Sequence, residues 1–78
     1  MVKLSTLAVG DEGVVVDIIA EEDTKLKIME MGLTNREIIK VTKKSPLGDP
    51  LSIGVRGYEL ILRVAEAENI LVNRITNG

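Results

Sequence analysis

The sequence predicts a mostly β protein, a small, partly closed barrel of about five strands with one short helix between the first two strands. Three observations support this prediction. Apolar and polar residues alternate through 51–56 and again through 58–63, which is the period of a half-buried strand. Residues 14–19 are rich in β-branched side chains, and the one good helix candidate is 25–31. Closing the sheet would remove strand edges that a chain of 78 residues could not otherwise cover.

The N-terminal segment is predicted to contain two turns and then the first strand. Leu4 to Leu7 forms a short lead-in turn that Ser5 can cap. Residues 9–13 contain two glycines and form the next turn. The first strand covers 14–19, where three consecutive valines leave open which of them face the core.

Acidic residues precede the predicted helix. Glu21, Glu22 and Asp23 suit the positive end of a helix dipole. Asp23 or Thr24 can serve as the N-cap. The helix is expected over 25–31, which is only about two turns, so it needs a sheet or a barrel mouth to pack against.

The predicted helix ends at a glycine. Gly32 falls where a helix C-terminus favours a left-handed residue, and Leu33 can fold back onto the helix. A turn at 34–36 follows. Residues three apart on the helix can share a face, so at least one of its two methionines is expected in the core. The pairs are Leu26 with Met29 and Ile28 with Met31.

The second strand is predicted over 37–44. Its alternation places Ile39 and Val41 toward the core and Lys40 and Thr42 outward.

A rigid loop, 45–50, follows the second strand. Pro46 and Pro50 restrict φ at its two ends, and Gly48 can adopt a positive φ without steric cost. Asp49 can hydrogen-bond nearby backbone amides and hold the turn.

The C-terminal half is predicted to complete the barrel with three more strands. Leu51, Ile53 and Val55 share one side of the third strand. The remaining elements are strands 51–56 and 58–63 joined at Gly57, a single helical turn at 64–69, a last strand at 70–75 and a frayed polar end at 76–78.

Composition excludes several classes of function. The chain has no cysteine and no histidine, which removes disulfides, thiolate zinc sites and imidazole ligands. One tyrosine, a net charge of −2 and a pI of about 5.0 argue against nucleic-acid binding. No apolar run approaches the length of a membrane span, so we expect one cytoplasmic domain over 1–78 without direct membrane insertion.

Candidate chemistry is sparse. The sequence contains no phosphate-binding glycine loop and no nucleophile elbow, and an enzyme is not expected. Clustered carboxylates could hold Fe²⁺ or another divalent cation through oxygen, although acids before a helix usually serve the helix. These weak metal candidates are Asp11, Glu12, Glu21, Glu22 and Asp23.

A binding module is the function class that remains. On the predicted strand phases Ile38, Ile61 and Leu71 point outward, and several exposed apolar residues on one face would mark a partner site. The alternative is that the helix and loops cover them.

Several segments together resemble the ferrous iron transport protein A (FeoA) family. They include a helix ending Met-Gly-Leu, a Pro-Leu-Gly-Asp-Pro loop and an Arg-Gly-x-x-Leu-x-Leu-Arg run. The resemblance implies an SH3-like barrel and a small cytosolic accessory protein of bacterial ferrous iron uptake. It implies, as partner, the cytosolic part of a FeoB-type membrane permease. The segments are 27–34, 45–50, 55–63, 67–70 and Val72, in register from about Leu4 to Ile75.

The chain departs from the family pattern at one turn. Where the family usually has Pro-Gly, this chain has Asn35-Arg36. Asparagine tolerates a left-handed φ, so we expect the positive-φ position to shift onto Asn35. Arg36 places a charge where the family has none, which could change partner specificity.

We therefore predict that the end of the helix and the 45–50 loop dock together on the permease. Gly32, Gly57 and Tyr58 are assigned to turn geometry, and backbone geometry alone could also explain Gly48 and Pro50. The alternatives are a metal-responsive sensor that uses the surface carboxylates, and a homo-oligomer formed through an open strand edge. The predicted docking residues are Met29, Met31, Leu33, Arg36, Pro46, Leu47, Gly48, Asp49 and Pro50.

Overall fold

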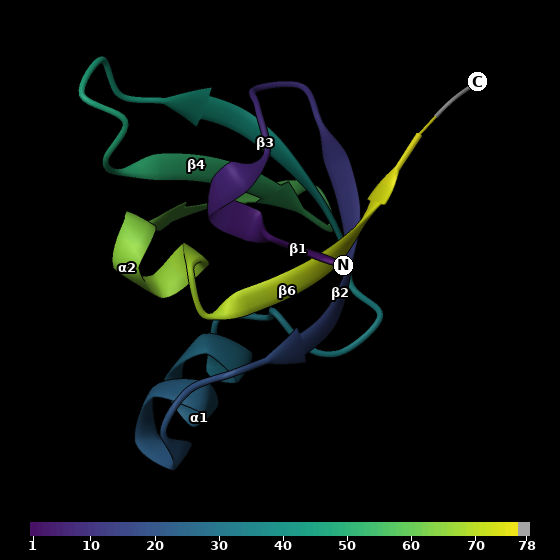
Figure 1. Ribbon diagram of the computed structural model, residues 1–78, viewed down its shortest axis with the longest axis vertical. Helices are drawn as coiled ribbons and strands as arrows, with labels where there is room; N and C mark the ends of the chain where they lie inside the picture. The colour runs from purple at the N-terminus through teal and green to yellow at the C-terminus, as the bar shows by residue number, and fades with distance from the viewer. Residues whose placement is uncertain (77–78) are drawn as a thin grey trace.

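The computed structural model describes residues 1–76, which form one antiparallel sheet that curls around a core, with short helices at its margins (Figure 1). The strand order is β1-β6-β2-β3-β4-β5. Neither helix in this part of the chain is long and apolar enough to cross a membrane. The elements are β1 Val2–Lys3, the 3-10 turn η1 Leu4–Thr6, β2 Glu12–Ile18, α1 Glu22–Glu30, β3 Ile38–Lys44, β4 Leu51–Val55, β5 Tyr58–Leu62, α2 Val64–Ala67 and β6 Ile70–Ile75.

The sheet contains one strand more than predicted. β1 is a two-residue strand that pairs with β6, with Val2 opposite Val72. The lead-in turn is the 3-10 turn η1, but Ser5 does not cap it. Instead, Thr6 donates its hydroxyl to the carbonyl oxygen of Lys3 at 2.7 Å. β1 is too short to show alternation, which is why the sequence pattern missed it.

A β-bulge decides which valines of β2 face the core. The pairing of β2 with β6 shifts register between Val15 and Asp17. Val15 and Ile18 are both buried although they are three residues apart, which simple alternation would forbid. Val14 and Val16 are half-buried.

α1 begins earlier than predicted, at Glu22 instead of Lys25. Glu21 occupies the N-cap position without a side-chain bond, so the expected caps at Asp23 and Thr24 are wrong. The acids at 22 and 23 instead lie in the first turn, where the helix dipole favours them.

One face of α1 closes the barrel at one end. Ile28 is fully buried, and Met31 packs against the core while partly exposed. Leu26 and Met29, the other predicted pair, are 50% and 37% exposed. One of the two methionines therefore contributes to the core, as expected.

The core draws on every element except β1. β3 faces inward with Ile39 and Val41, as predicted, but Thr42 is half-buried at a second bulge and its hydroxyl has no partner in the described structure. The last strand, β6, matches its predicted range. The polar end was expected to fray over 76–78, and of these residues 77 and 78 lie outside the described part. The buried residues are Leu4, Leu7, Val15, Ile18, Ile28, Leu33, Ile39, Val41, Leu51, Ile53, Val55, Leu62, Ala67, Ile70 and Val72.

Candidate protein-interaction surface

The 45–50 loop presents one apolar side chain almost completely to solvent. The Ser45 amide donates to the Pro50 carbonyl at 3.1 Å, and the Gly48 amide donates to the Ser45 carbonyl at 2.8 Å. The Ser45 hydroxyl donates to the Asp49 carbonyl at 2.7 Å. At the tip of this internally bonded loop, Leu47 is 95% exposed. Single exposed apolar side chains are common on protein surfaces, so Leu47 indicates a contact only together with other evidence for a partner.

Asp49 connects this loop to α2. Its carboxylate accepts a hydrogen bond from the Val64 amide at 3.1 Å, at the start of α2. The expectation that Asp49 bonds within its own turn is therefore wrong for the side chain, which reaches a different element. The Glu66 carboxylate completes the helix start by accepting from the Arg63 amide at 3.0 Å.

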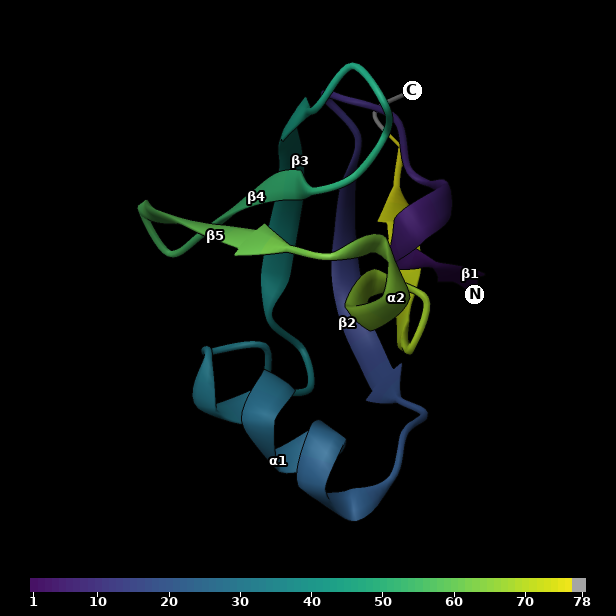
Figure 2. The same ribbon diagram turned by 90° about the vertical axis from the view of Figure 1, so that its left-hand side faces the viewer.

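α2 in turn faces α1. Lys27 on α1 and Glu66 on α2 form an ion pair, with Nζ and Oε2 3.9 Å apart. The loop and α1 lie at opposite ends of the long axis of the molecule, with α2 between them (Figures 1 and 2). The loop and the helix end therefore do not make one continuous patch by direct contact, and their predicted joint docking stays a prediction. α2 contacts both of them, the loop through the Asp49–Val64 hydrogen bond and α1 through the Lys27–Glu66 ion pair.

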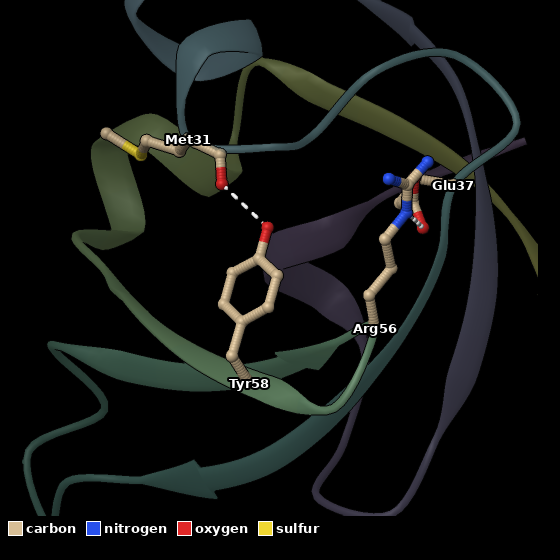
Figure 3. Close-up of polar contacts among 4 residues, drawn as sticks. All are labelled: Met31, Glu37, Arg56 and Tyr58. Carbon is tan, nitrogen blue, oxygen red and sulfur yellow. Dashed lines mark hydrogen bonds and ion pairs between the residues drawn. The ribbon is translucent and has the colours of Figure 1, made fainter.

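A tyrosine hydroxyl holds the end of α1. Tyr58, the first residue of β5, donates its hydroxyl to the Met31 carbonyl at 3.0 Å (Figure 3). Gly32 follows with φ of +102°. A Cβ at Gly32 would collide with the Tyr58 hydroxyl oxygen. This position therefore requires glycine both for its backbone and for the approach of Tyr58.

The turn after α1 keeps a positive φ at an arginine. The Glu37 amide donates to the Thr34 carbonyl at 3.1 Å, and Arg36, the third residue of this turn, has φ of +75°. Our expectation that Asn35 would take the positive φ is wrong. Arg36 is anchored through its own amide, which donates to the Val15 carbonyl at 2.7 Å. This backbone bond to β2 places the third turn residue, not the second, in the left-handed region.

A second arginine occupies the left-handed region in the β4–β5 turn. Arg56 has φ of +48° and Gly57 has φ of +84°, the pattern of a two-residue type I′ hairpin. Arg56 donates its Nε hydrogen to Glu37 Oε1 at 2.9 Å (Figure 3). This hydrogen bond raises the pKa of Arg56 above its ordinary value. The Glu37 side chain is only 10% exposed.

A shallow pocket of about 230 Å³ lies between α1 and β2. Met29, a predicted docking residue, contributes to its wall. Most of the wall is apolar, and its polar residues are one acid, one base and one amide. The lining residues are Val15, Val16, Asp17, Ile18, Lys25, Met29 and Asn35.

Not every predicted docking residue is accessible. Leu33 is fully buried, so it belongs to the core and cannot contact a partner. Met29, Arg36 and Leu47 are exposed. Sequence reasoning missed Glu37, Arg56 and the Lys27–Glu66 pair. The role of Glu66 could have been predicted, because an acid three residues after the N-cap, here Arg63, favours a capping hydrogen bond.

The acidic residues proposed as weak metal candidates do not gather into a site. Asp11 accepts hydrogen bonds from the Ala8 amide at 2.9 Å and from Arg74 at 3.1 Å. The Ala8 bond, aided by Arg74, lowers the pKa of Asp11 below its ordinary value. Glu21, Glu22 and Asp23 lie at the start of α1. Residues 1–76 contain no group of three or more acids, histidines or cysteines that could hold a metal ion.

Comparison with known proteins supports the predicted family. The FeoA domain model matches residues 2–74. The chain is 32% identical over 76 residues to the Fe(2+) transport protein A/Fe(2+) transporter FeoB fusion protein of Porphyromonas gingivalis. That match covers 97% of this chain but only 9% of the fusion protein.

Two solved structures are similar over nearly the whole chain. The FeoA-like protein from Clostridium acetobutylicum has a TM-score of 0.91 and 34% identity, and the match covers 99% of this chain and 90% of that one. The FeoA of Stenotrophomonas maltophilia, solved in complex with zinc, has a TM-score of 0.80 and 26% identity over 94% of this chain and 91% of that one. That protein is described as a prokaryotic SH3 domain protein, which confirms the predicted fold class.

Proposed function

Because the chain belongs to the FeoA family, which is associated with ferrous iron transport, we propose that it is a non-enzymatic accessory protein that binds the cytosolic part of a FeoB-type permease. The observation that carries this proposal is the P. gingivalis relative, in which a domain 32% identical to this chain is fused to the Fe(2+) transporter FeoB. Fusion keeps two domains at a high effective concentration, which favours binding between them.

Leu47 is the anchor that we propose for this interaction. Hydrogen bonds within the 45–50 loop order the backbone that carries Leu47, so little backbone entropy is lost when a partner covers it. A leucine that is 95% exposed has most of its apolar surface still to bury. These features are those of a pre-organised contact residue.

Met29 is the second contact that we propose, on α1, which lies at the opposite end of the long axis from the loop (Figure 1). It is 37% exposed and lines the pocket beside α1. The molecule measures 34 × 28 × 23 Å. One side of a standard protein interface covers about 800 Å², or roughly 28 Å across. The loop and α1 lie at opposite ends of the 34 Å dimension (Figure 1), so a partner that contacts both must present an elongated surface, longer than a standard interface.

Binding of this chain to the purified cytosolic part of the cognate permease tests the proposal. Leu47→Asp and Met29→Asp should each weaken the affinity about tenfold, the size of effect expected at an anchor residue. Ferrous iron uptake by cells that carry these variants should fall in parallel. Because Leu47 is 95% exposed, Leu47→Asp should unfold like the wild type, whereas Met29 is only 37% exposed, so its variant is compared only where its unfolding curve shows it to be folded.

Val9→Asp supplies the matched control. Val9 is 57% exposed but lies on the turn before β2, outside the proposed surface. Its substitution should change the affinity by less than about twofold, as expected for a substitution away from the contact. Folded Leu47→Asp and Met29→Asp variants that bind the permease and support uptake like the wild type would refute the proposal.

A further inference from the structure

Two arginines occupy backbone conformations that favour glycine. Within residues 1–76, Arg36 and Arg56 are the non-glycine residues with positive φ, at +75° and +48°. A side chain in this region brings Cβ close to the following carbonyl, a contact that glycine avoids. Glycine at either position would satisfy the turn without this cost. Backbone strain retained in this way is a known feature of functional positions.

The two arginines belong to neighbouring turns. Arg36 directly precedes Glu37, and Glu37 Oε1 accepts the Nε hydrogen of Arg56 at 2.9 Å. Glu37 thereby places the guanidinium of Arg56 beside the turn that carries Arg36 (Figure 3). The two adjacent turns thus carry two arginines, and Glu37 pairs with one of them, Arg56.

Glu37 occupies only one edge of the Arg56 guanidinium. The hydrogen bond uses Nε, and no hydrogen bond within the described residues uses either terminal nitrogen. The Arg56 side chain is 72% exposed. Two parallel N–H groups at the end of an arginine match the two oxygens of a carboxylate. The end of the Arg56 side chain is thus oriented and available for a bidentate contact.

We propose that Arg36 and Arg56 bind carboxylate side chains of an acidic segment in the partner protein. This inference rests on the proposed function and names the chemistry that the partner supplies near the end of α1. Asn35, next to Arg36, lines the apolar pocket together with Met29, so the segment would carry an apolar side chain beside its acids. Two arginines in a chain of net charge −2 are too few for nucleic-acid binding, which relies on many phosphate contacts.

Glycine substitutions test the proposal because they relieve strain while they remove charge. Arg36→Gly should leave the melting temperature unchanged or raise it. Arg36→Gly with Arg56→Gly should weaken binding to the permease's cytosolic part at least fivefold at low salt. The difference should shrink as salt rises, because exposed charges are screened.

Glu37→Gln is the matched control with the opposite expected sign. It keeps an oxygen that can accept from Arg56 but removes the negative charge that neutralises this arginine, so binding to acidic groups should strengthen. A fluorescein-labelled nonapeptide with three glutamates around a leucine is the second probe, and its glutamine version is the blank. The double glycine variant should lose affinity for the glutamate peptide in parallel with its loss of affinity for the permease.

The outcomes separate this inference from the proposed function. Permease binding that is the same for the wild type and the double glycine variant overturns the arginine inference and leaves the proposed function standing. Arginine-dependent binding of the glutamate peptide without permease binding supports the inference and overturns the proposed function. No binding to either probe overturns both. A lower melting temperature for Arg36→Gly would show that Arg36 serves folding instead.

Discussion

Substitution of Gly32 by alanine tests how the end of α1 is fastened to the barrel. Gly32 has φ of +102°, and a Cβ there would collide with the Tyr58 hydroxyl oxygen. The obstacle is the far end of a side chain, so Tyr58 can swing away. In doing so it would give up its 3.0 Å hydrogen bond to the Met31 carbonyl.

The cost of Gly32→Ala has two parts. An alanine at left-handed φ costs about 1–2 kcal/mol. Loss of the Tyr58 hydrogen bond costs about 0.5–1 kcal/mol, in the lower part of the usual range because Tyr58 is 42% exposed. The free energy of unfolding should therefore fall by about 1.5–3 kcal/mol, out of the ~4–12 kcal/mol typical of a domain of this size.

Urea unfolding of a double-mutant cycle separates the two parts. Tyr58→Phe removes the hydroxyl, so Gly32→Ala should cost about 0.5–1 kcal/mol less in that background than in the wild type. Gly48→Ala is the control, because Gly48 has φ of +85° and a Cβ there meets nothing within 4 Å. It should show the backbone cost alone and no coupling to Tyr58. Additive effects of Gly32→Ala and Tyr58→Phe, within about 0.3 kcal/mol, would refute the fastening argument.

Two further predictions concern carboxylates that accept backbone hydrogen bonds. Asp49→Ala should lower the free energy of unfolding by about 1 kcal/mol, since it removes the acceptor for the Val64 amide, whereas Asp49→Asn keeps an acceptor and should cost much less. Equal urea midpoints for the two variants would contradict this role. The pKa of Asp11 is lower in the folded protein than in the unfolded chain, where it is about 4, so the ionised carboxylate stabilises the fold. This contribution is complete above the unfolded pKa and disappears as the pH falls through the folded pKa. The stability advantage of the wild type over Asp11→Asn should thus be constant at neutral pH and shrink in acid, and an advantage that persists unchanged to pH 2 would contradict it.

Much of the fold could be predicted from local pattern. The alternation of Leu51, Ile53 and Val55 placed all three in the core, and the structure buries them. Ile39 and Val41 followed the same rule. Alternation works here because one face of each strand is buried. It failed at Thr42, because a β-bulge adds a residue that no periodic pattern signals.

The candidate surface was less predictable than the fold. Leu47 and Met29 were named from the sequence and are exposed. Leu33 was named with them, but it is buried because the chain turns inward after Gly32. The Glu37–Arg56 ion pair joins residues 19 apart across two turns, and nothing in either local sequence points to the other.

By itself, the sequence determined the fold class and the family. Periodicity, glycine and proline positions act over a few residues, and those are the distances over which strands, turns and motifs are specified. Only the tertiary structure decided where Asp49 and Tyr58 find their partners and how far the 45–50 loop lies from α1. It also decided that Arg36, and not Asn35, takes the left-handed backbone, because the bond from the Arg36 amide to β2 sets that turn. These outcomes depend on contacts between distant segments, which exist only when the sheet has closed around its core.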